Sequence, residues 1–308
     1  MKKILITPSS FGQISEEPLD ILKSAGFQVV KNPYGRKLTK SETVSLCQGC
    51  VGVVAGLETY DKEVLDQLSD LKIISRVGVG MDSIDQDYCE RIGVKVLNTP
   101  NGPTRAVAEL ALSLAMASLR KVGQAHHNLK SGHWKKETGY LIQNKTIGIL
   151  GVGRIGKASA ELFAALGNEV LGFDLFPDHE WSNKSGLRYV TFEELLSESD
   201  ILILHLSNSN PERPVIGNRE LGLMKDESFL VNLSRGGVLD ELALESYLDE
   251  GKFGGVALDV FSEEPYSGSL IGQDKIIFTP HLGSYAKEGK LQMEIDSCLN
   301  LIEASEVN

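Results

Sequence analysis

Short apolar runs alternate with amphipathic stretches through the first hundred residues of the chain. The apolar runs are four or five residues long and predict strands at residues 3–7, 27–31, 52–55, 73–77 and 94–98. The segments between them repeat apolar residues at helical spacing and predict helices at residues 17–25, 40–48, 62–69 and 83–92. Because strands that alternate with helices usually pair in parallel, this pattern predicts a doubly wound α/β domain.

A second series of strands and helices follows the first. Strands are predicted at residues 146–150, 169–174, 200–205, 229–234, 255–260 and 275–279, and helices at residues 154–166 and 240–251. One long helix is predicted over residues 104–131, where Pro103 precedes a threonine that can cap it. The amphipathic segment 291–302 is expected to pack on the first domain. We therefore predict two doubly wound parallel-sheet domains, one of residues 1–100 plus 285–308 and one of residues 101–284.

Three glycines follow a predicted strand and begin the helix after it. Gly151 allows a tight turn, Gly153 lets backbone N–H groups approach a pyrophosphate, and Gly156 lets the helix pack closely on the strand. Arg154 and Ile155 lie between the last two glycines and complete the predicted cofactor loop. This order of strand, glycines and helix is the dinucleotide-binding fingerprint of a Rossmann domain.

An acidic residue ends the next predicted strand. Asp174 is placed to accept hydrogen bonds from both hydroxyl groups of an adenosine ribose, and its negative charge would repel a 2′-phosphate. The sequence therefore favours NAD over NADP as the cofactor.

The chain is acidic, with a formal net charge of −11. This charge argues against nucleic acid or an anionic membrane surface as the main partner, because phosphate binding requires a basic surface. No stretch is apolar for long enough to span a bilayer, and the apolar run after Met1 is too short for a signal peptide. We therefore expect a cytoplasmic protein, in which a local basic pocket could bind a small acid.

Four cysteines are too few for a disulfide framework in a chain of 308 residues. Cys47 and Cys50 have the spacing of a metal-binding or redox pair, but no second pair or nearby histidine completes a zinc site. We favour two free thiols at the end of a helix and expect no metal.

Polar residues follow three predicted strands in the second half of the chain. Arg235, Glu264 and His281 each come shortly after a strand end, where parallel α/β sheets bind their ligands. The histidine can exchange a proton with a carbinol oxygen, and the glutamate would favour its imidazolium form. The arginine can bind a carboxylate and polarise a keto oxygen. Together with NAD, these residues predict hydride transfer to or from a 2-oxo or 2-hydroxy acid.

Several segments resemble the D-isomer-specific 2-hydroxyacid dehydrogenase family. The most specific are Val-Asn-Leu-Ser-Arg-Gly-Gly at residues 231–237, Ala-Leu-Asp-Val-Phe-Ser-Glu-Glu-Pro at residues 257–265, and Pro-His-Leu-Gly-Ser at residues 280–284. The likeness extends upstream through residues 75–85, 98–100 and 107–110, and so covers nearly the whole chain. It implies a flavodoxin-like substrate domain, a Rossmann NAD domain, hinge closure on the substrate, and a homodimer with the long helix after Thr104 at its interface.

The resemblance also implies residue roles. It places the family's catalytic arginine, glutamate and histidine on Arg235, Glu264 and His281, and it places Asp259 near the nicotinamide carboxamide. The N–H groups of one loop resemble the family's substrate-carboxylate site: Gly78, Val79 and Gly80. Further cofactor contacts are implied at His205, Ser234 and Gly283.

Within the family, residues 98–100, 104–109 and 132–134 are most similar to the phosphoglycerate-dehydrogenase-like branch. One departure concerns the substrate. Where phosphoglycerate enzymes have an arginine after the glycine that matches Gly56, this chain has Leu57-Glu58-Thr59, and Glu58 would repel a phosphate. The cations that could substitute are Arg36, Lys37 and Arg76.

Other departures concern the cofactor and regulation. Ser207 and Ser209 stand where the family usually has proline and threonine, and Pro103 replaces a residue that commonly forms hydrogen bonds. The two serines predict a cofactor loop that sits differently. Both changes bear on the nicotinamide geometry and leave the fold prediction intact. The regulatory domain of longer phosphoglycerate enzymes is not found in the sequence, so serine feedback through it is not expected. Glu264, rather than glutamine, argues against the formate dehydrogenase branch.

The sequence thus predicts an NAD-dependent dehydrogenase or reductase of a small D-2-hydroxy acid or 2-oxo acid, with 3-phosphoglycerate and hydroxypyruvate as candidates. The alternative is an NAD-sensing interaction protein, because corepressor relatives keep the fold and the catalytic residues. The intact set of Arg235, Glu264 and His281, without a basic patch or a disordered tail, favours catalysis.

Overall fold

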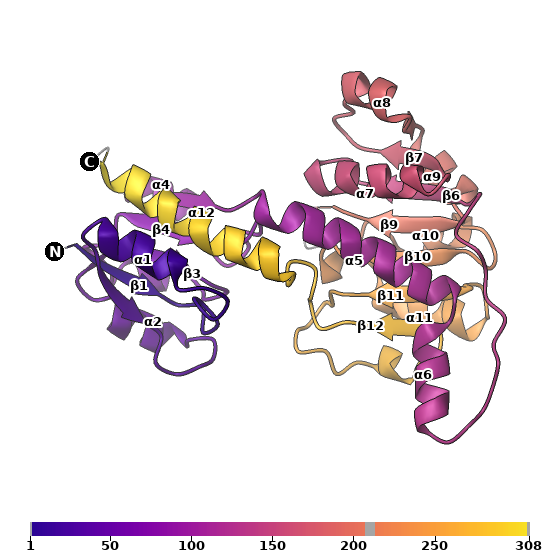
Figure 1. Cartoon of the computed structure of the whole chain (residues 1–308), viewed down its shortest axis with the longest axis horizontal. Coiled ribbons are helices and arrows are strands. Elements are labelled where there is room, and N and C mark those ends of the chain that lie inside the picture. The colour runs from indigo at the N-terminus through magenta and orange to yellow at the C-terminus, as the bar shows by residue number, and fades with distance from the viewer. Residues whose placement is uncertain (1, 207–212, 307–308) are drawn as a thin grey trace. The chain divides into compact units, whose positions relative to one another are not determined.

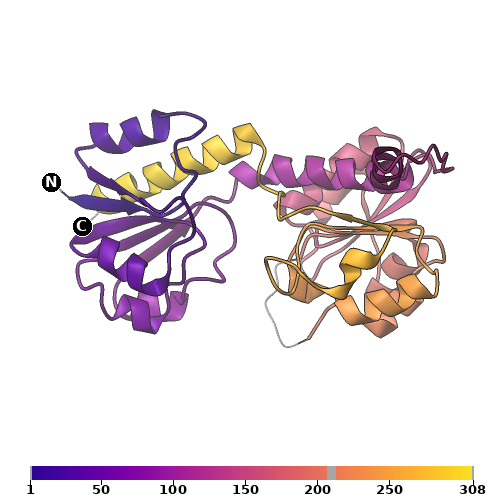
Figure 2. The ribbon, with the colours of Figure 1, turned by 90° about the horizontal axis from the view of Figure 1, so that it is seen from below.

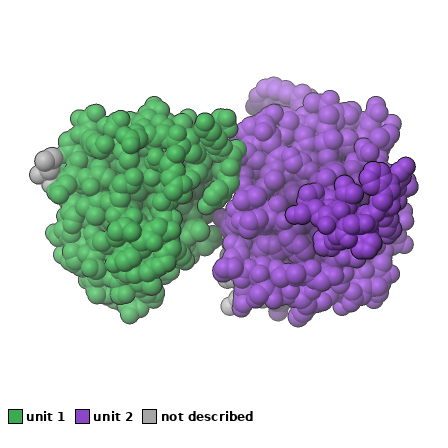
Figure 3. Space-filling model, turned by 60° about the horizontal axis from the view of Figure 1, so that its bottom comes forward, with its two compact units in different colours: residues 1–103, 284–308 green, residues 104–283 purple. Residues whose placement is uncertain are grey.

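The computed structural model describes residues 2–206 and 213–306. The chain divides into two compact units, coloured separately in Figure 3. Unit 1 consists of Met1–Pro103 and Ser284–Asn308, and unit 2 consists of Thr104–Gly283. Each unit is built on its own parallel sheet, as the alternation of strands and helices predicts.

Unit 1 contains a five-stranded parallel sheet in the order β2-β1-β3-β4-β5 (Figure 1). Its strands are β1 (Lys3–Ile6), β2 (Gln28–Lys31), β3 (Cys50–Ala55), β4 (Ile73–Arg76) and β5 (Lys95–Asn98). Its helices are α1 (Glu17–Ser24), α2 (Lys40–Cys47), α3 (Lys62–Leu65), α4 (Gln86–Arg91) and α12 (Lys287–Glu306). Helices cover both faces of this sheet, and α12 shares one face with α1 (Figure 2). This order is that of flavodoxin-like sheets, as expected.

The late helix α12 completes the core of unit 1. Its buried residues Cys298, Leu301 and Ala304 pack in one cluster with Ile4 of β1 and Val54 of β3. The predicted return of residues 291–302 to this sheet is therefore found, and the helix begins earlier, at Lys287.

Unit 2 contains a seven-stranded parallel sheet in the order β12-β11-β10-β9-β6-β7-β8. Its strands are β6 (Thr146–Leu150), β7 (Glu169–Phe173), β8 (Arg188–Tyr189), β9 (Ile201–Leu204), β10 (Phe229–Asn232), β11 (Gly255–Leu258) and β12 (Ile276–Phe278). Its helices are α6 (Val122–Lys130), α7 (Arg154–Ala165), α8 (His179–Ser185), α9 (Phe192–Glu198), α10 (Asn218–Leu223) and α11 (Glu241–Asp249), with most of α5 (Gly102–Leu119). The order reverses between β6 and β9, which is the switch point of a Rossmann fold.

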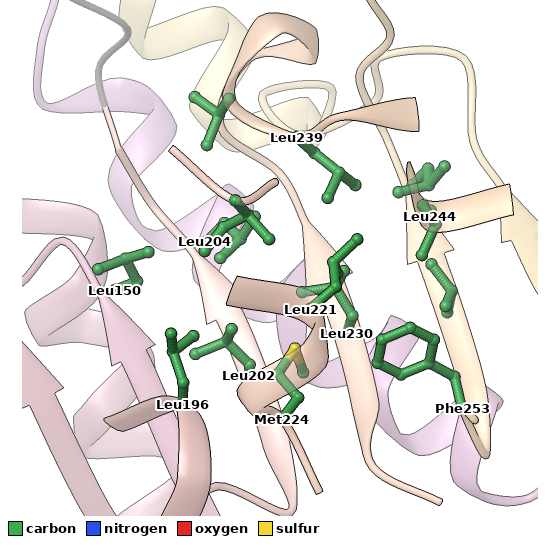
Figure 4. Packing of buried hydrophobic residues seen from close by; sticks show 14 of the residues in the cluster. Leu150, Leu196, Leu202, Leu204, Leu221, Met224, Leu230, Leu239, Leu244 and Phe253 are labelled. Atoms are coloured by element: carbon green, nitrogen blue, oxygen red, sulfur yellow. The ribbon is translucent and has the colours of Figure 1, made fainter. Parts of the chain in front are cut away.

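Three neighbouring strands of unit 2 are buried on both faces. All four residues of β9 are buried, as are those of β10 and β11, which explains their continuous apolar sequences. On one face they pack against α9, α10 and α11 in a leucine-rich cluster that includes Phe253 (Figure 4). On the other face they pack against α5 and α7. Both clusters fix the carboxyl ends of the strands, where the predicted site residues lie.

Several sequence predictions of elements were wrong or incomplete. The helix predicted over residues 104–131 is two helices, because Lys121 adopts a left-handed conformation with φ of 52° between α5 and α6. Among the α-helices and strands of unit 2, four were missed: α8, β8, α9 and α10. They are short, and β8 has two residues, so their periodicity is weak.

Two features are absent from the part of the chain that the structure describes. No helix within residues 2–206 and 213–306 combines the length and apolar character needed to cross a membrane. Among the same residues, no cluster of three or more histidine, cysteine, aspartate or glutamate side chains is arranged to hold a metal ion. All four cysteines are buried free thiols.

Candidate functional site

The glycine-rich turn after β6 is shaped by close backbone contacts. Gly151 has φ of 94°, and a Cβ atom there would lie 2.6 Å from the carbonyl oxygen of His205. A Cβ atom at Gly156 would lie 2.1 Å from the carbonyl oxygen of Gly151. Both glycines are therefore required by the fold itself, so that the strand, the turn and α7 can pack together.

Gly153 is different, because a Cβ atom there would meet no heavy atom within 4 Å. It is the N-cap residue of α7, and no side chain caps the first turn of this helix. The uncapped N–H groups and the positive end of the helix dipole face an open approach. These features fit a pyrophosphate, which would use the space that a larger residue would fill. Arg154 is the exposed first residue of α7, and Ile155 packs its side chain against the core.

Asp174 follows β7 and braces the same turn. Its Oδ2 atom accepts a hydrogen bond of 2.7 Å from the N–H group of Val152, and its Oδ1 atom accepts one of 2.9 Å from Phe176. Each carboxylate oxygen can accept a second hydrogen bond. Asp174 can therefore hold the glycine turn and still accept hydrogen bonds from ribose hydroxyl groups.

His205 lies directly after β9, beside the glycine turn. Its Nε2 atom is 2.8 Å from the hydroxyl oxygen of Ser159, and its Nδ1 atom is buried without a hydrogen-bond partner among the described residues. The residue as a whole is half-buried, and burial of the ring lowers its pKa to about 4. The ring is therefore neutral at physiological pH. Ser207 and Ser209 lie outside the described residues.

His281 and Glu264 form an ion-pair geometry in unit 2. The Nδ1 atom of His281 is 2.9 Å from Oε2 of Glu264, and both side chains are exposed, at 45% and 38%. The other oxygen of Glu264 accepts a hydrogen bond of 3.2 Å from the N–H group of Phe261. The contact between Nδ1 and Glu264 fixes which imidazole nitrogen faces the carboxylate. The Nε2 atom is left to exchange a proton with a ligand.

The loop that carries His281 is held by the buried carboxylate of Asp259. This carboxylate accepts hydrogen bonds from the Thr279 hydroxyl at 2.6 Å and from the N–H groups of Leu282 and Gly283 at 2.7 and 2.8 Å. His281 has φ of 54°, and its own N–H group donates to the Asp259 carbonyl at 2.9 Å. Burial raises the pKa of Asp259, while these hydrogen bonds act in the opposite direction. The carboxylate thus supports a backbone conformation that is unfavourable for histidine.

Arg235 follows β10 and is half-buried. Its Nη1 atom donates a hydrogen bond of 2.8 Å to the Ser234 carbonyl. Asn232 accepts hydrogen bonds from the Ser234 hydroxyl and N–H groups, and donates one of 3.3 Å to the Arg235 carbonyl. The short segment from β10 to the arginine is therefore fixed by one buried amide side chain.

The loops with Arg235, Glu264 and His281 follow β10, β11 and β12, which are neighbours in the sheet. A Cβ atom at Gly236 would lie 1.9 Å from the carbonyl group of Phe261, so the first two loops are in direct contact. The structure therefore brings a guanidinium, a carboxylate and an imidazole to one edge of unit 2. This set can bind an acid and exchange one proton.

The predicted carboxylate loop lies in unit 1, after β4. Gly78 has φ of 133°, and its N–H group donates to the Thr99 hydroxyl at 2.8 Å, so this N–H group is engaged within the protein. Asn98 donates a hydrogen bond of 3.0 Å to the Val79 carbonyl. Within the described part of the chain, no group accepts from the N–H groups of Val79 and Gly80. These two N–H groups are the ones that can bind an anion.

The cations considered for the substrate also belong to unit 1. Arg36 forms two hydrogen bonds of 2.8 and 2.7 Å with Glu42, on the surface. Lys37 is exposed. Arg76 donates to the Val77 carbonyl, and its guanidinium lies 3.3 Å from the place of a Cβ atom at Gly78. Of the three, Arg76 is the one in contact with the predicted carboxylate loop.

Sequence reasoning missed the residues that brace these loops. They are Asn98, Thr99, Ser159, Asn232 and Thr279. Asn98, Thr99 and Asn232 fall inside segments of family resemblance, and Thr279 immediately precedes one. Their location in or beside segments of family resemblance is the sequence feature that could have identified these residues.

Part of the chain matches a known protein family. Residues 112–283 match the model of the D-isomer specific 2-hydroxyacid dehydrogenase NAD-binding domain. The chain is 35% identical over 290 residues to the D-3-phosphoglycerate dehydrogenase of Archaeoglobus fulgidus, and the match covers 91% of this chain and 54% of that protein. It is 38% identical over 255 residues to the glyoxylate reductase of Thermococcus litoralis, and the match covers 80% of this chain and 77% of that protein.

The solved structure of the TT0316 protein from Thermus thermophilus is also similar. It has a TM-score of 0.89 and 29% sequence identity, and the match covers 99% of this chain and 97% of that one. The chain spans about half the length of the phosphoglycerate dehydrogenases that it matches, with coverage of 54%, 53% and 55% for three of them.

We expect the neutral ring of His205 to make unit 2 less stable in acid. The pKa of about 4 in the folded state lies below the ordinary value near 6.5, so unfolding takes up a proton as the pH falls through this window. The free energy of unfolding should fall by about 2 kcal/mol between pH 7.5 and pH 5 through this group alone. His205→Gln should remove that part of the loss.

The measurement is urea unfolding at both pH values, followed by tryptophan fluorescence. Both tryptophans, Trp134 and Trp181, lie in unit 2 and report on it alone. An equal loss of stability in the wild type and in His205→Gln would show that other groups control the acid response.

We expect Asp174→Ala to weaken the preference for NAD over NADP, because the carboxylate that would repel a 2′-phosphate is gone. The ratio of the two dissociation constants should move towards NADP by about tenfold or more, which corresponds to roughly 1.4 kcal/mol. Binding is measured by titration with NADH and NADPH. The affinity for NADH should also fall, since Val152 loses its acceptor. An unchanged ratio would assign the preference to another residue.

Proposed function

Because the chain belongs to the D-isomer specific 2-hydroxyacid dehydrogenase family, we propose that it transfers a hydride between NAD(H) and a small D-2-hydroxy acid or the corresponding 2-oxo acid. The observation that carries this proposal is the pair of His281 and Glu264 at 2.9 Å, beside the loop of Arg235 in the unit that binds NAD. This arrangement supplies the proton exchange that hydride transfer to a carbonyl group requires.

The cofactor would contact the residues around the glycine turn. Its pyrophosphate would take the N–H groups at Gly153 and the first turn of α7, and its ribose would bond to Asp174. Bound NADH supplies the hydride, and NAD accepts it in the opposite direction. We also keep the implied contacts at His205, Ser234, Asp259 and Gly283 as part of this proposal. The Asp259 carboxylate already accepts three hydrogen bonds, so its contribution would come mainly from positioning.

The residues of the chain would carry out the proton transfer and the binding of the substrate. During reduction, His281 donates the proton on Nε2 to the oxygen of the forming alcohol, and the Glu264 carboxylate holds the ring through Nδ1. During oxidation the same nitrogen takes the proton back. Arg235 binds the substrate as an anion and polarises its keto oxygen through charge-assisted hydrogen bonds. Within unit 1, the family resemblance assigns a carboxylate to the N–H groups of Val79 and Gly80.

The substrate belongs to the class shared by the relatives, the small 2-hydroxy and 2-oxo acids. We propose hydroxypyruvate and 3-phosphoglycerate as the first candidates, and a cytoplasmic location for the reaction. If no acid of this class reacts, while NADH changes the binding of a partner protein, the chain is an NAD-sensing protein on the same fold.

We also propose that the protein is a homodimer formed through unit 2. Large apolar side chains are exposed along α5, α6 and the segment after them: Met116 at 43%, Val122 at 54%, Leu129 at 59%, Trp134 at 83% and Leu141 at 71%. So many exposed apolar residues on one continuous stretch are typical of a protein interface. A second copy of this chain is the proposed occupant, because two identical surfaces of this kind can pair about a twofold axis.

We expect His281→Ala to lower kcat by about a hundredfold to ten-thousandfold, the usual contribution of general acid–base catalysis. NADH affinity should change less than threefold, because His281 lies at the reacting carbonyl and away from the adenosine. The assay follows NADH oxidation with hydroxypyruvate, glyoxylate, pyruvate, 2-oxoglutarate and 3-phosphohydroxypyruvate, and with NADPH as a cofactor control.

The matched control for this variant is His179→Ala, an exposed histidine of α8 in the same unit. It should keep full activity. Equal loss of turnover in both variants, or a loss of NADH binding as large as the loss of turnover in His281→Ala, would contradict the proposed role of His281.

We expect the wild type to elute as a dimer, and the double change Leu129→Glu and Trp134→Glu to produce monomers, because it places charges on the apolar stretch. Size-exclusion chromatography with light scattering measures both masses. Circular dichroism serves as the control for folding. A monomeric wild type, or a double variant that remains dimeric, would refute this interface.

A further inference from the structure

Unit 1 contains a buried carboxylate that the proposed reaction does not use. Glu58 follows β3 and is 2% exposed, although it belongs to a loop whose neighbour Leu57 is 59% exposed. Its side chain therefore points into the protein. Among the described residues no lysine, arginine or histidine forms an ion pair with it. A buried carboxylate without a cation is costly unless hydrogen bonds stabilise it.

Three donors from three different segments converge on Glu58. The Thr7 hydroxyl and the N–H group of Gly56 donate to Oε2, the second at 3.0 Å. The N–H group of Leu38 donates to Oε1 at 3.4 Å. The Thr7 hydroxyl also donates to the Val54 carbonyl at 3.3 Å, and the Gly56 N–H group also donates to the Thr7 hydroxyl at 2.8 Å, so these donors are shared. N–H and O–H donors that converge on one carboxylate form an anion-binding site. In this protein the anion in that site is the chain's own glutamate.

This site lies at the edge of the sheet where ligands of parallel α/β sheets bind. Thr7 follows β1 and Gly56 follows β3, and these two strands are neighbours. The next strand, β4, ends at Arg76 opposite Ala55, and the N–H group of Val77 donates to the Ala55 carbonyl at 3.0 Å. The predicted carboxylate loop, residues 78–80, therefore begins beside the donors that hold Glu58. A substrate whose carboxylate binds this loop would extend its other end along the same edge of unit 1.

Gly56 is adapted to this internal anion. A Cβ atom at Gly56 would lie 2.8 Å from Oε2 of Glu58 and 3.4 Å from Pro8. The glycine thus allows the carboxylate to approach the backbone N–H group directly. A glutamate that acted on a phosphate only through charge repulsion could remain exposed in the loop. The Glu58 carboxylate instead accepts the hydrogen bonds of the donors.

We propose that Glu58 is a specificity residue that fills an anion subsite in advance, so that the substrate of this protein carries a single anionic group. Its carboxylate takes the donors that a second anionic group, such as a phosphate, would need, and its charge repels such a group. The preferred substrates are then unphosphorylated 2-oxo or 2-hydroxy acids. This inference rests on the proposed function for its substrate class, and the donor site itself can be tested without turnover.

The test compares hydroxypyruvate with 3-phosphohydroxypyruvate, which differ only in the phosphate. The wild type should have a kcat/KM at least tenfold higher for hydroxypyruvate. In Glu58→Gln, which keeps the size of the side chain and removes its charge, and in Glu58→Ala, the ratio should move at least tenfold towards the phosphorylated acid through KM. The control is Glu63→Ala, which removes a charge from an exposed position of unit 1, where the side chain is 75% exposed, and should leave the ratio unchanged.

A second readout uses inorganic phosphate alone and needs no activity. Phosphate should raise the Tm of Glu58→Ala, or of Glu58→Gln if the alanine variant does not fold, and should leave the Tm of the wild type and of Glu63→Ala unchanged. A wild type that prefers the phosphorylated acid, or Glu58 variants that fold but show neither a changed ratio nor phosphate stabilisation, would overturn the inference. A wild type that reduces no acid would refute the proposed function, and the phosphate readout would still decide whether Glu58 fills an anion site.

Discussion

The buried carboxylate of Asp259 is the constraint on which the chemistry in unit 2 depends. A parallel sheet leaves N–H groups at the ends of its strands, and those of the loop after β12 must find acceptors. Asp259 provides them for Leu282 and Gly283, and it also binds the Thr279 hydroxyl. His281 can therefore stay in a left-handed conformation that costs about 1 kcal/mol or more for a residue with a side chain. Without these contacts the imidazole would not be fixed opposite Glu264.

Three carboxylates near strand ends differ in burial or in the donors that surround them, and their roles differ accordingly. Glu264 is 38% exposed and has one backbone donor, so its other oxygen is left to bind the ring of His281. Asp259 is buried and accepts hydrogen bonds from the loop that it positions. Glu58 is also buried, and its donors come from three separate segments of unit 1. The residue type alone does not distinguish these roles, whereas the set of donors around each carboxylate does.

The sequence predicted the elements that are buried on both faces, because their apolar runs are continuous. The strands β9, β10 and β11 are of this kind, and the glycines Gly151 and Gly156 marked the turn that packs against them. The break at Lys121 was missed, since the apolar spacing of α5 and α6 continues across it while the backbone does not. The hydrogen bond between Thr279 and Asp259 could not be predicted, because it joins segments whose relative positions only the fold defines. For the same reason, the sequence of this loop did not predict that the side chain of Glu58 points into the protein.

The discontinuity of unit 1 has a consequence for how the protein acquires its structure during synthesis. Its sheet is made from the first hundred residues, but the cluster on one face also needs Cys298 and Leu301 of α12. The ribosome makes all of unit 2 before it makes this helix. Unit 2 can close its own core first, whereas the apolar face formed by Ile4, Ile6 and Val54 is covered only by the segment around α1 until translation has passed residue 300. We therefore expect the nascent chain to depend on chaperones through unit 1, although unit 1 is the first to be translated.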